Sequence, residues 1–170
     1  MLISAVMKKM IAFSEGNLHD INHFLKVYAY ARTIGELEQL DRETRLILEI
    51  AAITHDIACP LCREKYENTD GKHQEREGGP LVWEFLKDTG LTEAQTERVV
   101  RLVAHHHTID PVDGPDHQIL LEADYLVNAD ESGYSRENIL HTREILFKTK
   151  AGTDLLDSVY GLQINIERSI

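Results

Sequence analysis

Residues 51–57 read AAITHDI, an apolar helical segment that ends in the dipeptide His55-Asp56. An Asp directly after a His, at the inner end of a buried helix, is costly unless both side chains are paired or bound to a metal ion. Imidazole and carboxylate together suit Mn, Fe, Co, Ni or Zn. For an isolated His-Asp pair, a helix end turned toward water is the better interpretation, so the rest of the chain must decide.

Helical periodicity continues on the N-terminal side of this dipeptide. Apolar residues recur at helical spacing from Ile21 to Leu37, with Asp20 as the expected N-cap. A second helix is expected from about Arg42 to His55. The first residues also fit one helical face, formed by Leu2, Ile3, Val6, Met7 and Met10.

The C-terminal side follows the same pattern after an interruption. Residues 57–78 hold both cysteines, a proline and many charges, and we expect a long loop there. Helices are expected from Pro80 to Gly90, from a capping box of Thr92 and Gln95 to the histidine triplet, around Asp124, and over 135–149 and 152–162. No alternating run is long enough for a convincing strand. We predict an all-α protein, a compact single-domain helical bundle over residues 1–170.

The charge balance narrows the function. With 18 Lys and Arg against 29 Asp and Glu, the net charge is −11. An acidic surface repels nucleic-acid polymers and anionic lipid, so we expect neither a nucleic acid nor a membrane as partner. A small phosphate ester could still bind, but a metal ion and a few Lys or Arg would have to supply positive charge locally. The apolar N-terminus is broken by Lys8-Lys9 and is not expected to be a signal peptide. With two cysteines, we expect a cytoplasmic protein with reduced thiols.

Two further residues join the His-Asp pair. His23 lies on the preceding long helix, 55 − 23 = 32 residues upstream. Asp124 lies in ILLEADYLVNAD, residues 119–130, on a helix that is apolar on most sides. An Asp in such surroundings is expected to cap, to bridge or to bind a metal rather than to be solvated. Together His23, His55, Asp56 and Asp124 offer two nitrogen and two oxygen ligands and leave positions open for water, as catalytic metal sites require.

In this order and context, these four residues resemble the H…HD…D signature of the HD-domain superfamily of metal-dependent phosphohydrolases. The resemblance covers about residues 18–130 and is carried by HFLKVYAYA (23–31), AAITHDIA (51–58) and ADYLVNAD (123–130). Members of that family are all-helical, bind one or two divalent metals and mostly hydrolyse phosphate esters of nucleotides. The resemblance therefore implies a divalent ion (Mn, Fe, Co, Ni, Zn or Mg) at these four residues and a small phosphorylated substrate.

The same resemblance points to a second metal or to substrate contacts. Family members with two metals take further ligands from the region of His105-His106-His107 and from the segment before it, where His73 is the candidate. Helical spacing puts His106 on the inward side, His105 as second choice and His107 at the pocket rim. A second metal at His73, His105 and His106 is one alternative; solvent exposure or phosphate binding is the other.

Basic residues near these motifs are candidate phosphate contacts. Many family members carry Arg where this chain has Lys26, and Lys cannot form a bidentate clamp. Lys72 and Arg76 lie in GKHQEREGG, residues 71–79, where an ordinary charged loop is an equally good interpretation. We expect substrate binding by Lys26, Lys72, Arg76 and His105, and catalytic roles for Asp56, His106 and Lys72.

Several other residues receive a simpler interpretation. His19-Asp20 is a decoy pair, because capping explains its Asp. Cys59 and Cys62 form neither a complete zinc ribbon nor a thioredoxin-like site, and we expect reduced thiols. His117 and His141 are expected at the surface, and Trp83 and the methionines in the core.

The sequence thus favours a hydrolase that cleaves a phosphate ester through a metal-activated water. A non-catalytic nucleotide- or metal-binding sensor is one alternative, and a di-iron oxygenase is another. Substrate, metal identity and number, and oligomeric state, including a homodimer, stay open.

Overall fold

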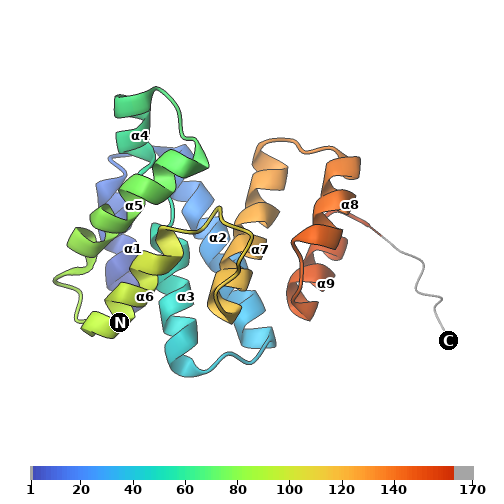
Figure 1. The fold of residues 1–170 in the computed structure, drawn as a ribbon, viewed down its shortest axis with the longest axis horizontal. Helices are drawn as coiled ribbons and strands as arrows, with labels where there is room; N and C mark the ends of the chain where they lie inside the picture. The colour runs from blue at the N-terminus through green and yellow to red at the C-terminus, as the bar shows by residue number, and fades with distance from the viewer. Residues whose placement is uncertain (1, 163–170) are drawn as a thin grey trace.

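The computed structural model describes residues 2–162, which form helices and no strand (Figure 1). The predicted all-α fold is therefore confirmed over this part of the chain. Its nine helices are α1 (Leu2–Phe13), α2 (Leu18–Leu37), α3 (Arg42–Thr54), α4 (Cys59–Tyr66), α5 (Gly71–Leu86), α6 (Glu93–Val103), α7 (Pro115–Glu131), α8 (Arg136–Ile145) and α9 (Lys150–Val159). None of these helices has the length and hydropathy needed to cross a membrane.

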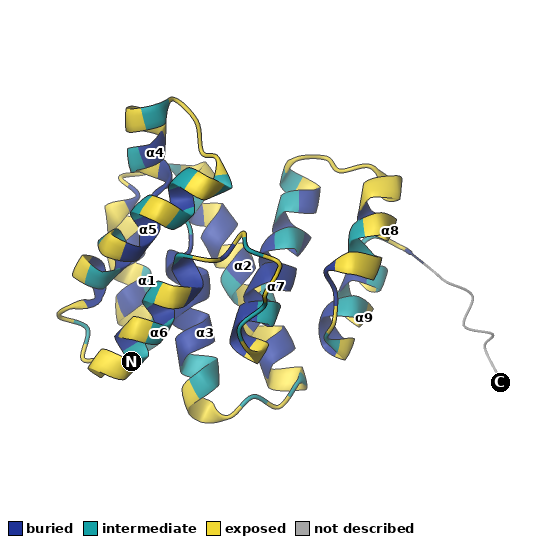
Figure 2. Cartoon of the chain, in the orientation of Figure 1, coloured by how far each residue is buried: buried dark blue, intermediate teal, exposed yellow. Residues whose placement is uncertain are grey.

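Helix α3 lies at the centre of the molecule. It packs against α1, α2, α6 and α7, and every residue from Ile47 to Thr54 is buried. Figure 2 shows this as dark blue along most of α3 and of α7. Burial of each large aliphatic side chain stabilises the fold by about 1.5–3 kcal/mol. Because α3 is enclosed up to its last residue, His55 emerges at a point surrounded by other helices.

Short polar side chains cap the starts of α2, α3, α6, α8 and α9. Asn17, not Asp20, is the N-cap of α2, and its side-chain oxygen accepts a hydrogen bond from the Asp20 backbone N–H at 3.2 Å. The sequence-based assignment of Asp20 as the cap was wrong, because Asn17 is an equally good cap residue three positions earlier. Asp41 caps α3 by accepting from the backbone N–H groups of Glu43 and Thr44.

The prediction of a long loop over residues 57–78 was also wrong. This segment contains α4 and the first half of α5, and only residues 67–70 separate the two helices. The cysteines of α4 are buried, and Pro60 lies in its first turn, where a missing N–H is tolerated. Pro80 does not start a helix but lies inside α5. Many charges of this region lie on exposed faces of α4 and of the first half of α5, which the apolar pattern alone does not reveal.

The remaining expectations mostly hold. The capping box of Thr92 and Gln95 opens α6, and α8 and α9 are the two short C-terminal helices. The bounds of the two C-terminal helices differ from those predicted. Helix α8 ends at Ile145 rather than at 149, and α9 spans Lys150–Val159 rather than 152–162. Trp83 is only half-buried, and His117, expected at the surface, is buried.

Candidate metal centre

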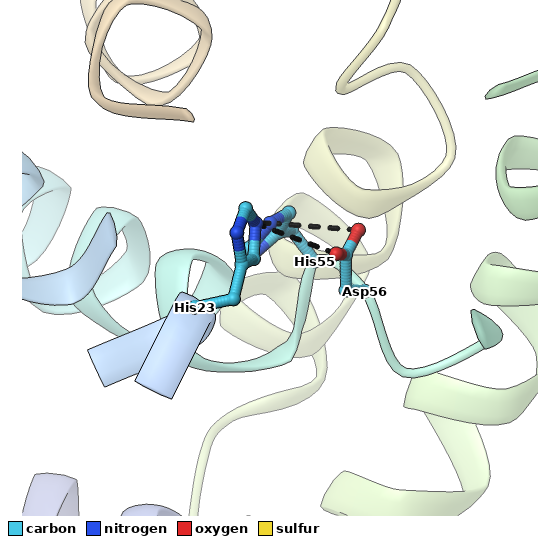
Figure 3. A group of neighbouring side chains, drawn as sticks. All are labelled: His23, His55 and Asp56. Atoms are coloured by element: carbon cyan, nitrogen blue, oxygen red, sulfur yellow. Dashed lines mark hydrogen bonds and ion pairs between the residues drawn. The ribbon is translucent and has the colours of Figure 1, made fainter. Parts of the chain in front are cut away.

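Three helices, α2, α3 and α7, bring the predicted ligands together. His23 lies on the second turn of α2, His55 directly follows α3, and Asp124 lies within α7. Figure 3 shows the rings of His23 and His55 and the carboxylate of Asp56 facing one another. Because α2 and α7 both pack against α3 and against each other, their inner faces meet at the end of α3. We call His23, His55, Asp56 and Asp124 the primary group.

The ligand atoms of the primary group are spaced as the neighbouring corners of a coordination shell would be. His23 Nε2 lies 3.1 Å from His55 Nε2, 3.4 Å from Asp56 Oδ2 and 3.2 Å from Asp124 Oδ1. His55 Nε2 lies 3.5 Å from Asp56 Oδ1 and 3.4 Å from Asp124 Oδ1. An ion about 2.0–2.2 Å from each ligand atom places adjacent ligands about 3.0–3.5 Å apart.

The hydrogen bonds on the far side of each ring fix which nitrogen faces the centre. His55 Nδ1 lies 3.0 Å from the Ala52 carbonyl oxygen, and His23 Nδ1 lies 2.8 Å from Glu131 Oε2. Both Nδ1 atoms therefore donate, and in the neutral tautomer both Nε2 atoms present lone pairs to the centre. Two nitrogen lone pairs and two carboxylates converge with no donor among them. A divalent cation satisfies all of these acceptors, so the residues fit a metal.

Protonation states respond to the same crowding. Burial opposes protonation of His23, but its contacts with Asp124, Asp56 and Glu131 outweigh this and raise its pKa to about 9. Burial alone would raise the pKa of Asp56, yet His55, His106 and His23 hold it well below its usual range. The pKa of Asp124 is also lowered, because the contacts with His23 and His55 outweigh the effect of burial. Without an ion, a proton on His23 takes part of the cation's place.

A second cluster shares Asp56. One ligand atom each from Asp56, His106 and His107 lies within 4.8 Å of the others, and we call these three residues the second group. His106 is buried, and its Nδ1 lies 2.7 Å from the Val103 carbonyl oxygen. Its Nε2 is 3.4 Å from Asp56 Oδ1 and makes no hydrogen bond with any residue that the structure describes. A buried nitrogen without a partner beside a shared carboxylate is suited to a second ion or to substrate.

The other two predicted ligands of a second metal lie elsewhere. His105 is exposed, and its Nδ1 lies 2.8 Å from the Arg101 carbonyl oxygen. His73 stacks on the ring of Tyr66, with ring centroids 4.0 Å apart. The structure thus groups His106 and His107 with Asp56, and it does not bring His73 or His105 into either cluster. His107 is exposed, in keeping with the rim position expected from sequence, and it still offers a ligand atom to the second group.

Two carboxylates that the sequence did not single out support these clusters. Glu131 accepts from His23 on one oxygen and from Lys26 Nζ on the other, at 3.1 Å. Its signal was the spacing of seven residues from Asp124, which puts both on one face of α7. Glu75 of α5 accepts from the His107 backbone N–H at 3.0 Å and from the Thr108 hydroxyl at 2.9 Å. No sequence pattern separates Glu75 from its charged neighbours.

The candidate phosphate contacts differ in their availability. Lys26 donates a hydrogen bond to Glu131, which also contacts His23 of the primary group. Lys72 is exposed at the start of α5. The guanidinium of Arg76 is engaged with Tyr66 and Glu77. Cys59 and Cys62 are free, buried thiols, and burial raises the pKa of Cys59 far above its usual range.

Comparison with known proteins agrees with this geometry. A model of the HD domain family matches residues 20–131, which include all four residues of the primary group. Among solved structures, the chain is similar to a crystal structure of a predicted HD superfamily hydrolase from an uncultured Thermotogales bacterium. The TM-score is 0.68 at 21% sequence identity, over 94% of this chain and 85% of that chain. At this identity the structural similarity supports the fold alone. No curated protein matches the chain.

Proposed function

This chain belongs to the HD-domain family, and from that premise we propose that it is a metal-dependent phosphohydrolase. The observation that carries the proposal is the convergence of four acceptor side chains, two imidazoles and two carboxylates, at a buried point. The substrate we propose is a small phosphate ester, of a nucleotide or a related molecule, rather than a nucleic-acid polymer.

In the proposed reaction, the residues of the primary group bind the metal, and Asp56 also orients the attacking water. A bound divalent ion would supply positive charge for the phosphoryl oxygens and lower the pKa of a water toward about 7. His23, His55, Asp56 and Asp124 would hold it. Asp56 has Oδ2 near His23 and Oδ1 near His55 and His106, so it stands between the two groups. Because its pKa is held low, Asp56 stays ionised at neutral pH and orients the attacking water by accepting a hydrogen bond.

His106 has two roles that depend on the number of ions. If the second group holds an ion, His106 Nε2 is a ligand and His107 is its neighbour. If it does not, the same atom can donate a proton to the leaving oxygen. The pKa of His106 is raised because Asp56 and Asp124 outweigh the effect of burial, and this favours the protonated form. Lys26 and Lys72 are the proposed phosphate contacts.

The proposal is tested with the full chain loaded with Mn²⁺, Co²⁺ or Ni²⁺. We expect release of phosphate from a generic aryl phosphate and, in a nucleotide panel, preference for some members. We expect His55→Ala and Asp56→Ala to lose bound metal, by elemental analysis, and hydrolysis, while helix content stays that of the wild type. Wild-type metal content in both variants would refute the site. Metal binding without hydrolysis of any phosphate ester would favour a non-catalytic sensor.

The number of ions is tested at His106. With two ions, His106→Ala lowers metal stoichiometry from about two toward one. With one ion, the variant keeps its metal and turns over more slowly. His105→Ala is the matched control, since His105 lies outside both groups. Wild-type metal content and turnover in His106→Ala would mean that the second group is structural.

A further inference from the structure

Arg63 was not singled out by sequence, and it contacts Asp20, which lies one helical turn before His23 of the primary group. On α2, Asp20 precedes His23 by three residues, so the two share a face about 4.5 Å apart along the helix axis. On the facing segment, the Cys59 N–H donates to the Asp56 carbonyl at 2.9 Å, and Arg63 follows one turn later. These two segments meet at His23 and Asp56, 3.4 Å apart, and again at Asp20 and Arg63.

The contact between Arg63 and Asp20 is a two-point ion pair. Nη1 of Arg63 donates to Asp20 Oδ1 at 3.3 Å, and Nη2 donates to Oδ2. The Asp20 side chain is only 14% exposed, whereas that of Arg63 is 42% exposed. A guanidinium has five N–H donors, so three of them have no acceptor among the described residues. Asp20 therefore fixes the orientation of Arg63 without using up its hydrogen-bonding capacity.

The negative charge around the metal centre makes a nearby cation useful for binding an anionic substrate. Asp56, Asp124 and Glu131 all contact His23, and Asp20 lies one turn before His23 on α2, in a chain whose net charge is −11. An anionic substrate is repelled by these carboxylates unless cations stand among them. Arg63 is within electrostatic reach of the centre: its pKa is raised first by the hydrogen bond to Asp20 and further by the charge of Asp56. Its planar fork suits phosphoryl oxygens.

We propose that Arg63 is a substrate-binding residue that donates its free N–H groups to the phosphoryl oxygens of the substrate, and that Asp20 positions it. This inference rests on the proposed function. The alternative interpretation is that the ion pair only holds α4 against α2. A partly exposed ion pair of this kind contributes only about 0–1 kcal/mol to stability. The two interpretations differ in what the folded, metal-loaded protein binds.

The probe is inorganic phosphate, titrated calorimetrically into the full chain loaded with Mn²⁺. We expect Arg63→Met to weaken phosphate binding about tenfold or more, as loss of charge-assisted hydrogen bonds does, at unchanged Mn²⁺ content. Arg63→Lys should recover part of the affinity. Arg143→Met is the matched control, because Arg143 makes the same two-point pair with Asp157 on the outer helices. It should bind phosphate as the wild type does.

The variant Asp20→Asn distinguishes direct substrate contact by Arg63 from a purely structural ion pair between α4 and α2. It breaks the ion pair but keeps the guanidinium. A larger loss of phosphate affinity in Arg63→Met than in Asp20→Asn supports direct contact. Equal losses in both variants, or wild-type affinity in Arg63→Met, overturn the inference while leaving the proposed function in place. Failure of the wild-type protein to bind phosphate at all would instead count against the proposed function itself.

Discussion

His23 is held through both of its ring nitrogens. Nδ1 donates to Glu131, and Nε2 faces the two carboxylates of the primary group. Glu131 is in turn fixed by Lys26. Such a carboxylate behind a ligating imidazole fixes its tautomer and raises its basicity, and removing it commonly lowers metal affinity 10–100-fold.

We therefore expect Glu131→Ala to weaken metal binding about 10–100-fold, measured by competition with a chelator. Glu131→Gln, which keeps one acceptor oxygen, should lose less. Asp130→Ala is the control, because the Asp130 side chain is 74% exposed and, among the described residues, its ion pair is with Lys26 alone. Unchanged metal affinity in Glu131→Ala would show that the tautomer of His23 is fixed without this carboxylate.

The raised pKa of His23 predicts a pH dependence for the metal-free protein. The pKa of His23 is about 9 in the folded chain, above its ordinary value of 6.5, so the folded state holds this proton more tightly than the unfolded state. Its contribution, on the order of 3 kcal/mol, is fully present below about pH 6.5 and is lost as the pH rises through about 9. His106, whose pKa is also raised, acts in the same direction.

The measurement is urea unfolding of metal-free protein between pH 6 and pH 9. We expect the free energy of unfolding to fall over this range, and His23→Gln to flatten the fall. A free energy that rises with pH in the wild type would contradict the assigned protonation of His23.

Secondary structure could be predicted from the sequence where the apolar pattern is long and uninterrupted. Helices α2, α3 and α7 have such patterns, and all three were predicted from them. Helix α4 has only two buried residues, Cys59 and Cys62, and neither is part of an apolar periodicity. Pro80 marks a helix start by local rules, but the preceding turns of α5 are held by packing against α6, which a local rule does not contain.

The contact between α5 and α6 is close at one glycine and relaxed at the next. A Cβ at Gly78 would lie 2.9 Å from Val103 Cγ1, whereas a Cβ at Gly79 would lie no closer than 3.5 Å to any neighbour. Val103 also supplies the carbonyl that accepts from His106. The spacing of these two helices is therefore linked to the position of the second group.

We expect Gly78→Ala to destabilise the protein by about 1–3 kcal/mol through overpacking. Gly79→Ala should be neutral or stabilise by up to about 1 kcal/mol through helix propensity. Denaturant unfolding of the two single variants compares them directly. Equal effects from both substitutions would mean that α5 and α6 can move apart without cost.

At the scale of the whole molecule, the chain order of the ligands was predictable and their support was not. The order His23, His55-Asp56 and Asp124 could be predicted because each residue stands in a distinctive apolar segment. Glu75 and Arg63 act through partners 32 and 43 residues away, respectively. Pairs of this kind depend on how helices cross, and a single sequence does not show which charged residue of an exposed face meets which.

Metal should stabilise the entire fold, since its ligands meet only in the folded state. At a free ion concentration one hundred times the dissociation constant, the expected gain is about 2.7 kcal/mol. We expect a higher midpoint of thermal unfolding with added Mn²⁺, reversed by a chelator, and no shift in His55→Ala. A comparable shift in that variant would place the stabilising ion elsewhere on the acidic surface.

Because the primary group joins α2, the end of α3 and α7, an ion there closes loops of the chain between residues 23 and 124, while α8 and α9 lie outside those loops. Opening of the enclosed helices would have to break ligand bonds, whereas opening of the two outer helices would not. We expect metal to slow amide hydrogen exchange strongly in α2, α3 and α7 and little in α8 and α9. The bound metal would then divide the protein into two regions that open at different rates, although both belong to one continuous chain.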